Sequence, residues 1–237
     1  MSRTSVPRSS SHRRDHRSAL TALEKRALTW MALRLPGRIN SDHLSALGLA
    51  SMFAAGVSFA AFRVTPLAAP AVVLCLMANW FGDSLDGTLA RVRGHERPRY
   101  GFYVDHVIDV AGSVFLLAGL ACSGAMSPLI AMVVLAAYLL VCAETYLATH
   151  AVGVFRMSFL GLGPTELRIV LAAGALKIMH SPGVSIAMLG EVRLFDLGGS
   201  IASIGLAVVF LVSAIRNSLA LYAAEPIPSC RNESRAA

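Results

Sequence analysis

Four aspartates stand close together in an otherwise largely apolar stretch of the chain: Asp83, Asp86, Asp105 and Asp109. The first two are three residues apart and the last two are four residues apart, so on helices each pair would share one face. The polar stretch 92–100 between the pairs predicts a short connection, which would make the two helices antiparallel neighbours. We therefore expect both acidic faces to meet at the same depth of a helical bundle.

Four converging carboxylates would repel one another strongly, so their approach requires a neutralising cation. Ligation by oxygen atoms alone favours Mg²⁺, Mn²⁺ or Ca²⁺ over zinc, and four carboxylates are enough for two such ions. A site of this kind suits phosphoryl transfer, in which metal ions neutralise phosphate oxygens and activate the leaving group. In the competing interpretation, the aspartates cap helices or form ion pairs with arginines of the loop, namely Arg91, Arg93, Arg97 and Arg99. Four acidic residues in register beside glycines favour the metal site.

Two small residues and an arginine follow the first acidic pair. Gly87 and Ala90 are three apart, and their missing side chains leave a slot where a flat base or a phosphate can approach the backbone. Small residues at this spacing also serve helix packing in membranes. Arg91 follows directly, and its planar guanidinium can grip a pyrophosphate through two parallel hydrogen bonds. The three residues together favour a bound ligand over packing alone.

The composition places these residues in a membrane protein. Hydrophobic residues make up 55% of the 237-residue chain, charged residues make up 15%, and the mean hydropathy is +0.61, whereas soluble domains carry about 25% charged residues. A bilayer core of about 30 Å takes about 20 apolar residues to cross. Spans are predicted at about 44–62, 67–90, 107–125, 129–148, 167–178 and 199–221.

The remaining segments complete the predicted architecture. Residues 1–18 are polar and basic and lack the apolar core of a signal peptide, which predicts a disordered tail. Residues 19–35 carry apolar side chains at helical spacing, which predicts an amphipathic helix on the membrane surface or packed on the bundle itself. We expect an all-α integral membrane fold with one six-span domain over 36–224 and a second tail over 225–237.

The basic residues predict an orientation for this bundle. With the amino terminus inside, all but Arg63, Lys177 and Arg193 of the 21 lysines and arginines fall on the inner side. The positive-inside rule then places both termini in the cytoplasm. The net charge of +7 reflects this orientation and requires no nucleic-acid partner. The lack of a targeting peptide and the small size favour a bacterial inner membrane.

The chain resembles the CDP-alcohol phosphatidyltransferases in the arrangement Asp83-x2-Asp86-Gly87-x2-Ala90-Arg91-x9-Gly101-x3-Asp105-x3-Asp109. In phospholipid synthesis these membrane enzymes move a substituted phospho-group from a CDP-linked donor to an alcohol hydroxyl and release CMP. The resemblance implies the same reaction here, with Mg²⁺ or Mn²⁺ as cofactor and two ions in the site. It also implies a homodimer whose interface lies in the later spans.

The resemblance further implies a role for each position of the motif. The metal ligands would be Asp83, Asp86, Asp105 and Asp109. Asp109 would also act as the general base on the acceptor hydroxyl. The donor nucleotide would lie against Gly87, Ala90, Arg91 and Gly101. Residues 36–45 resemble the segment before the first span of the family, and Ser45 stands where a threonine is common, so it is a further candidate donor contact.

The acceptor site is open between two chemistries. Residues 144–150 and 163–168 look similar to a region of the choline/ethanolamine phosphotransferases, in which a CDP-amino-alcohol donates to diacylglycerol. Elsewhere in the family, CDP-diacylglycerol donates to a small alcohol or an alcohol phosphate. A phosphorylated acceptor would suit the arginines Arg156, Arg168 and Arg216. An amine-bearing substrate would suit the carboxylates and aromatic ring of Glu144, Tyr146 and Glu166.

Two other classes of protein compete with this interpretation. A metal-dependent prenyltransferase would need a second acidic motif on another helix pair, and no such cluster follows Asp109. A non-catalytic membrane ion-binding or transport protein would be expected to show an inverted repeat, and no second half echoes residues 79–109. Both alternatives are therefore weaker than the transferase.

Overall fold

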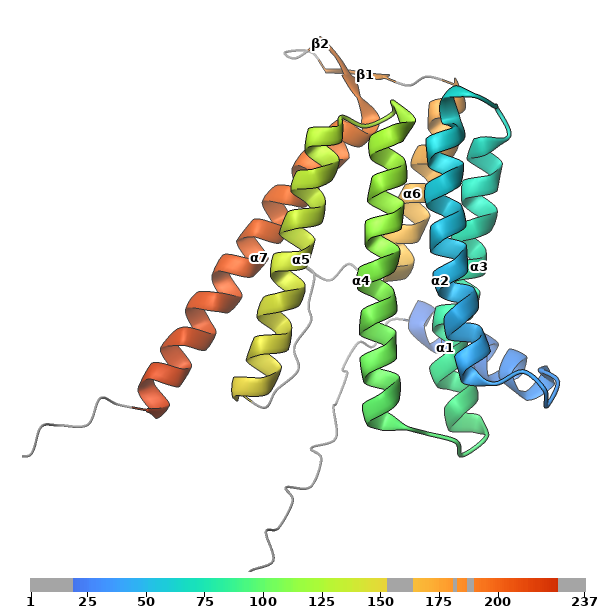
Figure 1. Cartoon of the computed structure of the whole chain (residues 1–237), viewed down its shortest axis with the longest axis vertical. Helices are drawn as coiled ribbons and strands as arrows, with labels where there is room; N and C mark the ends of the chain where they lie inside the picture. The colour runs from blue at the N-terminus through green and yellow to red at the C-terminus, as the bar shows by residue number, and fades with distance from the viewer. Residues whose placement is uncertain (1–18, 153–163, 181–182, 187–189, 226–237) are drawn as a thin grey trace, which may run out of the picture.

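The computed structural model describes residues 19–152, 164–180, 183–186 and 190–225. Within these ranges the elements are α1 (Ala19–Arg34), α2 (Ser41–Ala60), the 3-10 helix η1 (Ala61–Arg63), α3 (Ala68–Val92), α4 (Pro98–Ser123), α5 (Pro128–Val152), α6 (Pro164–His180), β1 (Gly183–Ile186), β2 (Gly190–Arg193) and α7 (Leu194–Ala224). Helices α2 to α7 form a bundle with the β-hairpin at one end, and α1 lies across the bundle near the other (Figure 1). These are called the hairpin end and the α1 end.

Local sequence signals set where several of these helices begin and end. Asn40 caps α2, because its side chain accepts a hydrogen bond from the His43 N–H at 2.9 Å while its own N–H donates to His43 Nδ1 at 3.2 Å. This reciprocal pair is a capping box. Proline opens α4, α5 and α6, where its missing N–H has no intrahelical partner to lose. Gly124 ends α4 at a φ of 76°, which glycine adopts without strain.

The long helices make the chain an integral membrane protein. Within the described ranges, five helices are long and apolar enough to cross a bilayer: α2 with η1, α3, α4, α5 and α7. The fifth predicted span, at 167–178, corresponds to α6, whose 17 residues extend for about 25 Å at the helical rise. Helix α6 is not among these five helices, so the six-span count stays a prediction. The helix predicted over 19–35 corresponds to α1.

A β-hairpin joins α6 to α7 and departs from the expected all-α fold. The two strands pair antiparallel with Gly183 opposite Arg193 and Ile186 opposite Gly190. Each strand begins with a glycine and contains β-branched residues, which favour strand over helix. The hairpin lies at the end of the bundle opposite the connection between α3 and α4 (Figure 1).

Glycines let α2 approach α3 and α4 closely. A Cβ atom on Gly82 would lie 2.6 Å from the Leu44 carbonyl oxygen, and one on Gly119 would lie 2.0 Å from the Gly56 carbonyl oxygen. Neither approach is possible for a larger residue without moving the backbone, as is common where small residues mediate helix packing in membranes. Because Gly82 directly precedes Asp83, this contact fixes the height at which the first aspartate meets α2.

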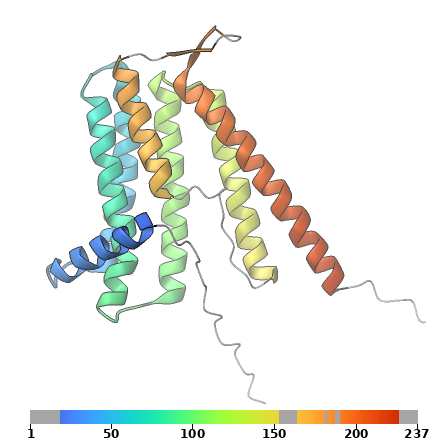
Figure 2. The same ribbon diagram turned by 180° about the vertical axis from the view of Figure 1, so that it is seen from behind.

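Helix α1 packs one face on the bundle. Leu28 and Ala32 bury themselves in a small apolar cluster with Leu44, Leu85 and Leu89. The opposite face leaves Trp30 and Leu33 exposed, and Figure 2 shows the helix crossing α3 at a steep angle. Of the two alternatives predicted for this segment, packing on the bundle is therefore observed, and a location on the membrane surface stays a prediction.

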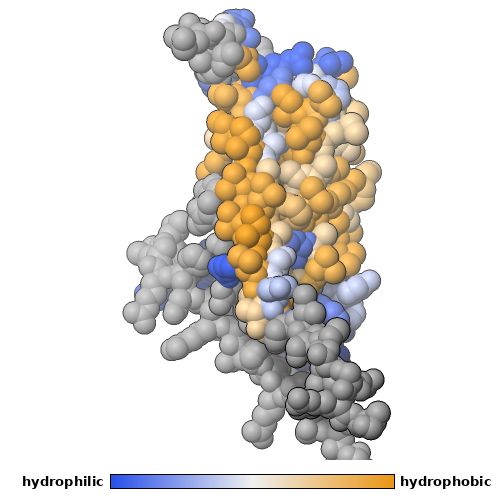
Figure 3. All heavy atoms as spheres, turned by 90° about the vertical axis from the view of Figure 1, so that its left-hand side faces the viewer, coloured by the Kyte–Doolittle hydropathy of each residue, from blue (hydrophilic) through white to orange (hydrophobic). Residues whose placement is uncertain are grey.

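Helices α5 and α7 run side by side and lean away from α4 toward the α1 end (Figures 1 and 2). The face shown in Figure 3 carries a broad apolar band below a hydrophilic end. On α7 the exposed aliphatic side chains include Ile201, Ile204, Val208, Leu211, Val212, Ile215 and Leu219. Such a surface is suited to contact with lipid tails and lies between the polar groups of the two ends.

Candidate active site

Three of the four aspartates face one small cavity near the α1 end of the bundle. The cavity has a volume of about 10 Å³ and is lined by Ser45, Gly48, Asn79, Asp83, Asp86, Asp105 and Ile108. These residues come from α2, α3 and α4. The predicted meeting of the two acidic helix faces is therefore present, and α2 closes the third side.

Asp86 is held by the first turns of α2. The Ser45 hydroxyl donates to Asp86 Oδ2 at 2.6 Å, and the Ser41 hydroxyl donates to the Asp86 carbonyl oxygen at 2.9 Å. The N–H of Gly87 also donates to Asp86 Oδ1. Ser45, predicted as a donor contact, thus touches a predicted metal ligand directly and fixes the orientation of its carboxylate.

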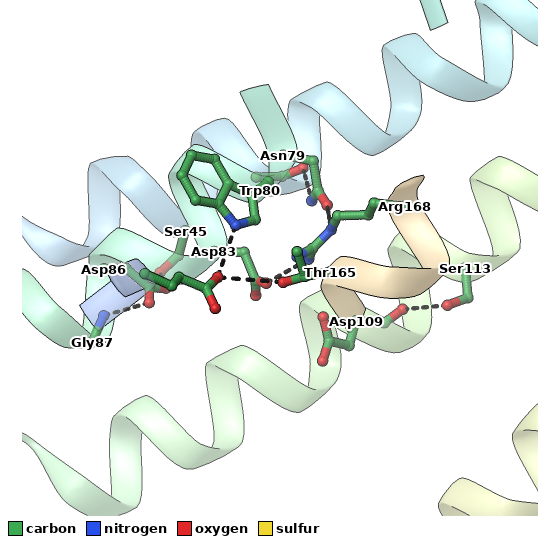
Figure 4. A network of polar contacts seen from close by, with 12 residues as sticks. Ser45, Asn79, Trp80, Asp83, Asp86, Gly87, Asp109, Ser113, Thr165 and Arg168 are labelled. Atoms are coloured by element: carbon green, nitrogen blue, oxygen red, sulfur yellow. Dashed lines mark hydrogen bonds and ion pairs between the residues drawn. The ribbon is translucent and has the colours of Figure 1, made fainter. Parts of the chain in front are cut away.

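Asp83 is paired with an arginine from α6. Arg168 Nη2 lies 2.5 Å from Asp83 Oδ2, and Arg168 Nε donates to Asn79 Oδ1 at 2.7 Å. Asn79 in turn donates from Nδ2 to the Gly48 carbonyl oxygen at 3.0 Å. Figure 4 shows the side chains of this network converging on the Arg168 guanidinium. Helices α2, α3 and α6 are therefore connected by polar contacts at the depth of Asp83.

This network changes how the acidic cluster is neutralised. Metal ions alone are expected from the sequence to neutralise the aspartates, whereas in the structure Arg168 supplies one positive charge to Asp83. Arg168 was predicted as an acceptor residue and here contacts the metal-ligand set. Sequence reasoning assigned no role to Asn79, although a carboxamide inside a predicted span is a signal, because polar groups at that depth need partners.

Asp105 and Asp109 lie on successive turns of α4. Asp105 Oδ2 is 3.5 Å from His106 Nδ1, and the same nitrogen is 2.7 Å from the Phe102 carbonyl oxygen. Asp109 is exposed, and its carboxylate interacts electrostatically with Asp83, Asp105 and Arg168. Within the described part of the chain, no group donates a hydrogen bond to the Asp109 carboxylate.

A second, larger cavity adjoins the end of α3. It measures about 390 Å³ and is lined by Asn40, Ser41, Asp42, Leu89, Ala90, Arg93, His95, Glu96 and Arg97. Ser41 also contacts Asp86, so the cavity begins beside the acidic site. Its size and its polar rim suit a nucleotide more than a lipid tail.

The other residues predicted to bind the donor nucleotide are Gly87, Arg91 and Gly101, and none of them lines either cavity. A Cβ atom on Gly87 would meet only the Arg91 guanidinium, at 3.5 Å. Arg91 is exposed, and its Nη2 donates to the Thr88 hydroxyl at 3.1 Å. Gly101 is exposed with open space where a side chain would stand, and it lines neither of the two cavities.

Two of the loop arginines stabilise the connection between α1 and α2. Arg97 Nη2 lies 2.5 Å from Asp42 Oδ1. Arg93 Nη2 donates to the carbonyl oxygens of Leu35 and Pro36 at 2.9 and 3.1 Å, and its Nη1 donates to that of Ile39. These contacts shape the wall of the larger cavity.

The predicted acceptor residues are not gathered into one pocket by the described structure. The Tyr146 ring lies 5.5 Å from that of His106, near Asp105. Glu144 Oε1 instead accepts a hydrogen bond from Asn217 Nδ2 of α7 at 2.7 Å. Glu166 and Arg216 are exposed. Arg156 lies outside the described residues. Tyr146 and Arg168 are thus the members of the predicted set that lie beside the aspartates.

The residues around the small cavity fit a divalent cation of the magnesium type. Their donor atoms are carboxylate, hydroxyl and carboxamide oxygens, which such cations prefer, and about 10 to 15 Å³ is room for one water-sized occupant. Among the described side chains, no three carboxylate, imidazole or thiol groups stand together in ligating geometry. In this arrangement Arg168 engages Asp83 and Ser45 engages Asp86.

Comparison with known proteins identifies the class of this site. The model of the CDP-alcohol phosphatidyltransferase family matches residues 43–211, and the chain belongs to that family. It is accordingly a membrane enzyme that transfers a phosphatidyl group from a CDP-alcohol. The matched region contains α2 to α6 and most of α7, with all four aspartates.

The fold is also that of a solved relative. The structure is similar to the crystal structure of phosphatidylinositol phosphate synthase (PgsA1) from Mycobacterium tuberculosis with CDP-DAG bound, at a TM-score of 0.52 and 20% sequence identity. The similarity covers 83% of this chain and 92% of that chain. The chain matches no curated protein sequence. At this identity the likeness shows the fold.

Proposed function

We propose that this enzyme synthesises a phospholipid by transferring a phosphatidyl group from CDP-diacylglycerol to the hydroxyl of a small alcohol, with release of CMP. The observation that carries the proposal is the position of two cavities on either side of one contact, in which Ser41 of the larger cavity donates to the Asp86 carbonyl oxygen. Asp83, Asp86 and Asp105 face the small one, and Ala90 of the donor motif lines the larger one next to it. A CDP-lipid bound in the solved neighbour named above supports the choice of donor.

The four aspartates are the proposed metal ligands. Asp83, Asp86, Asp105 and Asp109 would hold two Mg²⁺ or Mn²⁺ ions, and these would neutralise charge on the donor pyrophosphate. Ser45 fixes the Asp86 carboxylate, and Arg168 with Asn79 fixes that of Asp83. These contacts hold the ligands in place before substrate arrives, which lowers the reorganisation needed for catalysis.

Asp109 is the general base in this proposal. Its carboxylate takes the proton from the acceptor hydroxyl as the oxygen attacks the phosphorus that bears the lipid, and the bond from that phosphorus to the CMP oxygen breaks. CMP leaves with the electron pair of that bond as a phosphate anion. Asp109 suits this role because, in the described ranges, its oxygens accept no hydrogen bond, so they remain available within about 2.6 to 3.2 Å of a bound hydroxyl.

The acceptor alcohol enters next to Asp109 and Tyr146 in this scheme. Arg168 offers a positive charge for a phosphorylated alcohol, and the pair formed by Tyr146 and His106 offers aromatic faces for an amine. A CDP-amino-alcohol donor with diacylglycerol as acceptor is the corresponding alternative. In the first mode the diacylglycerol carries the CDP group, and in the second the amino-alcohol carries it. One experiment with both kinds of donor therefore separates them.

The experiment is a panel of donors and acceptors with CMP as the measured product. Purified enzyme in nanodiscs receives CDP-diacylglycerol with glycerol, inositol, serine or their phosphates, or CDP-choline or CDP-ethanolamine with diacylglycerol. We expect CMP release only with CDP-diacylglycerol as donor and only in the presence of Mg²⁺ or Mn²⁺. Chelation should abolish the release, and returning the metal should restore it fully. Release from CDP-choline with diacylglycerol would overturn the donor assignment.

Orientation and assembly belong to the same proposal. Arg63, Lys177 and Arg193 lie on elements that reach the hairpin end, which supports a cytoplasmic α1 end and cytoplasmic termini, as in a bacterial inner membrane. A homodimer through the later spans is also proposed. The exposed aliphatic face of α7 supports it. Gly199 of α7 instead faces inward, toward Ile130 of α5 and toward Met126 in the connection before α5. Accessibility of single cysteines placed at Gly37 and Gly190 would test the orientation.

A further inference from the structure

Glu24 connects the surface helix α1 to two helices of the active site. Its Oε1 atom accepts a hydrogen bond from Trp80 Nε1 at 3.1 Å and another from the Thr165 hydroxyl at 3.4 Å. Figure 4 shows the Trp80 and Thr165 side chains reaching toward the same oxygen. Trp80 belongs to α3 and Thr165 to the first turn of α6, so one carboxylate joins three helices.

Both donors stand one helical turn from the ion pair at the active site. Trp80 is three residues before Asp83 on α3, and Thr165 is three residues before Arg168 on α6. Residues three apart on a helix face the same side. The Glu24 contacts and the contact between Arg168 and Asp83 therefore connect α3 and α6 at two successive helical turns.

Helix α1, which carries Glu24, is itself held against the bundle by several contacts. Leu28 and Ala32 are buried against the bundle, and Arg93 at the end of α3 donates to the carbonyl oxygens that follow α1. Glu24 is thus fixed to α3 through several contacts along its own helix. Its bond to Thr165 is what extends that support to the beginning of α6.

We infer that Glu24 is a positioning residue that sets the beginning of α6 against α3, so that the Arg168 guanidinium reaches Asp83 and Asn79. This inference rests on the proposed function, because its consequence is read as catalytic activity. The role requires an acceptor oxygen at this position and does not require a negative charge. Glutamine supplies such an oxygen and alanine supplies none.

The decisive experiment compares Glu24→Ala with Glu24→Gln and combines each with Arg168→Gln. CMP release from CDP-diacylglycerol is measured as kcat and as KM for the donor. Losing a hydrogen bond to a charged group changes an equilibrium or rate constant by about tenfold or more. We therefore expect Glu24→Ala to lower kcat/KM by about tenfold. The kcat/KM of Glu24→Gln should stay within about threefold of wild type. Thr29→Ala is the matched control, because its hydroxyl bonds only within α1, to the Lys25 carbonyl oxygen.

The double variants separate positioning from general stability. If Glu24 acts through Arg168, then Glu24→Ala adds less than about threefold to the defect of Arg168→Gln, since contacts in one network are not additive. If the kcat/KM loss of the double variant equals the product of the two single losses, the inference is overturned, because Glu24 would then act independently of Arg168. Equal defects in Glu24→Ala and Glu24→Gln would overturn it too, because charge would be the requirement.

Tryptophan fluorescence tests the contact without any substrate. The chain has two tryptophans, so Trp30→Phe leaves Trp80 as the only one. In that background we expect Glu24→Ala to shift the Trp80 emission and Glu24→Gln to preserve it. Unchanged emission in Glu24→Ala would contradict the hydrogen bond. Wild-type enzyme that releases no CMP from any donor would refute the proposed function, whereas active wild type with equally active Glu24→Ala would refute this inference alone.

Discussion

The two halves of the bundle are packed in different ways. Helices α2, α3 and α4 meet through glycine contacts, and 39% of the apolar window of α3 is buried, whereas only 6% of that of α7 is buried. The four aspartates lie in the tight half, and Glu144 lies in the loose half, bonded to Asn217. The predicted metal ligands therefore stand on closely packed helices, whereas α7 presents most of its apolar surface outward.

The largest expected effect is at Asp109, the proposed general base on α4. Asp109→Asn keeps the size of the side chain but removes its ability to take a proton, so we expect CMP release to fall by about 100- to 10,000-fold. Steady-state kinetics with CDP-diacylglycerol measures this. Asp196→Asn is the control, since Asp196 accepts a hydrogen bond from the Ser127 N–H near the hairpin end. Activity retained by Asp109→Asn would place the base elsewhere.

The glycine contacts of the tight half can be broken next. Gly119→Ala places a Cβ atom 2.0 Å from the Gly56 carbonyl oxygen, so α2 and α4 must separate. We expect the free energy of unfolding to fall by about 1 to 3 kcal/mol, measured by denaturant titration in detergent. Gly198→Ala in α7 is the matched control, because open space surrounds that position. Equal losses at both positions would mean that the halves do not differ in packing.

A smaller effect is expected where α2 holds Asp86. Ser45→Ala removes the 2.6 Å hydrogen bond to Asp86 Oδ2, and we expect kcat/KM to fall by about tenfold with a higher Mg²⁺ requirement. Ser45→Thr keeps the hydroxyl and is expected to remain near wild type. Metal titration of activity distinguishes the two variants. A normal metal requirement in Ser45→Ala would indicate that Ser45 contacts the donor instead.

The smallest effect is expected in the loose half. Asn217→Ala removes the bond to Glu144, and hydrogen bonds between membrane helices contribute about 0.6 kcal/mol on average. We expect a stability loss of that order and CMP release within about threefold of wild type. Glu144→Gln should behave similarly. Loss of activity with one acceptor only would instead assign Glu144 to acceptor binding and bring the loose half into the site.

Local patterns were enough to predict much of the site. The three- and four-residue spacings of the aspartates and the polar stretch 92–100 predicted that α3 and α4 would bring acidic faces together, and Asp83, Asp86 and Asp105 do line one cavity. The family was predicted from the same residues and is confirmed by the match over 43–211. These features are local in the chain, so helical periodicity and a short loop were sufficient to predict them.

The partners of the aspartates were not predictable in the same way. Arg168 lies 85 residues from Asp83, and Glu24 lies 141 residues from Thr165, so no periodicity relates them. The sequence by itself determined the membrane class, the helices and the acidic motif, because each depends on composition or on neighbours within a few turns. Only the tertiary structure decided that Arg168 neutralises Asp83, that Ser45 holds Asp86 and that Glu24 ties α1 to α6. Those contacts depend on how separate helices pack, which is set by shape complementarity such as the fit of Gly82 against α2.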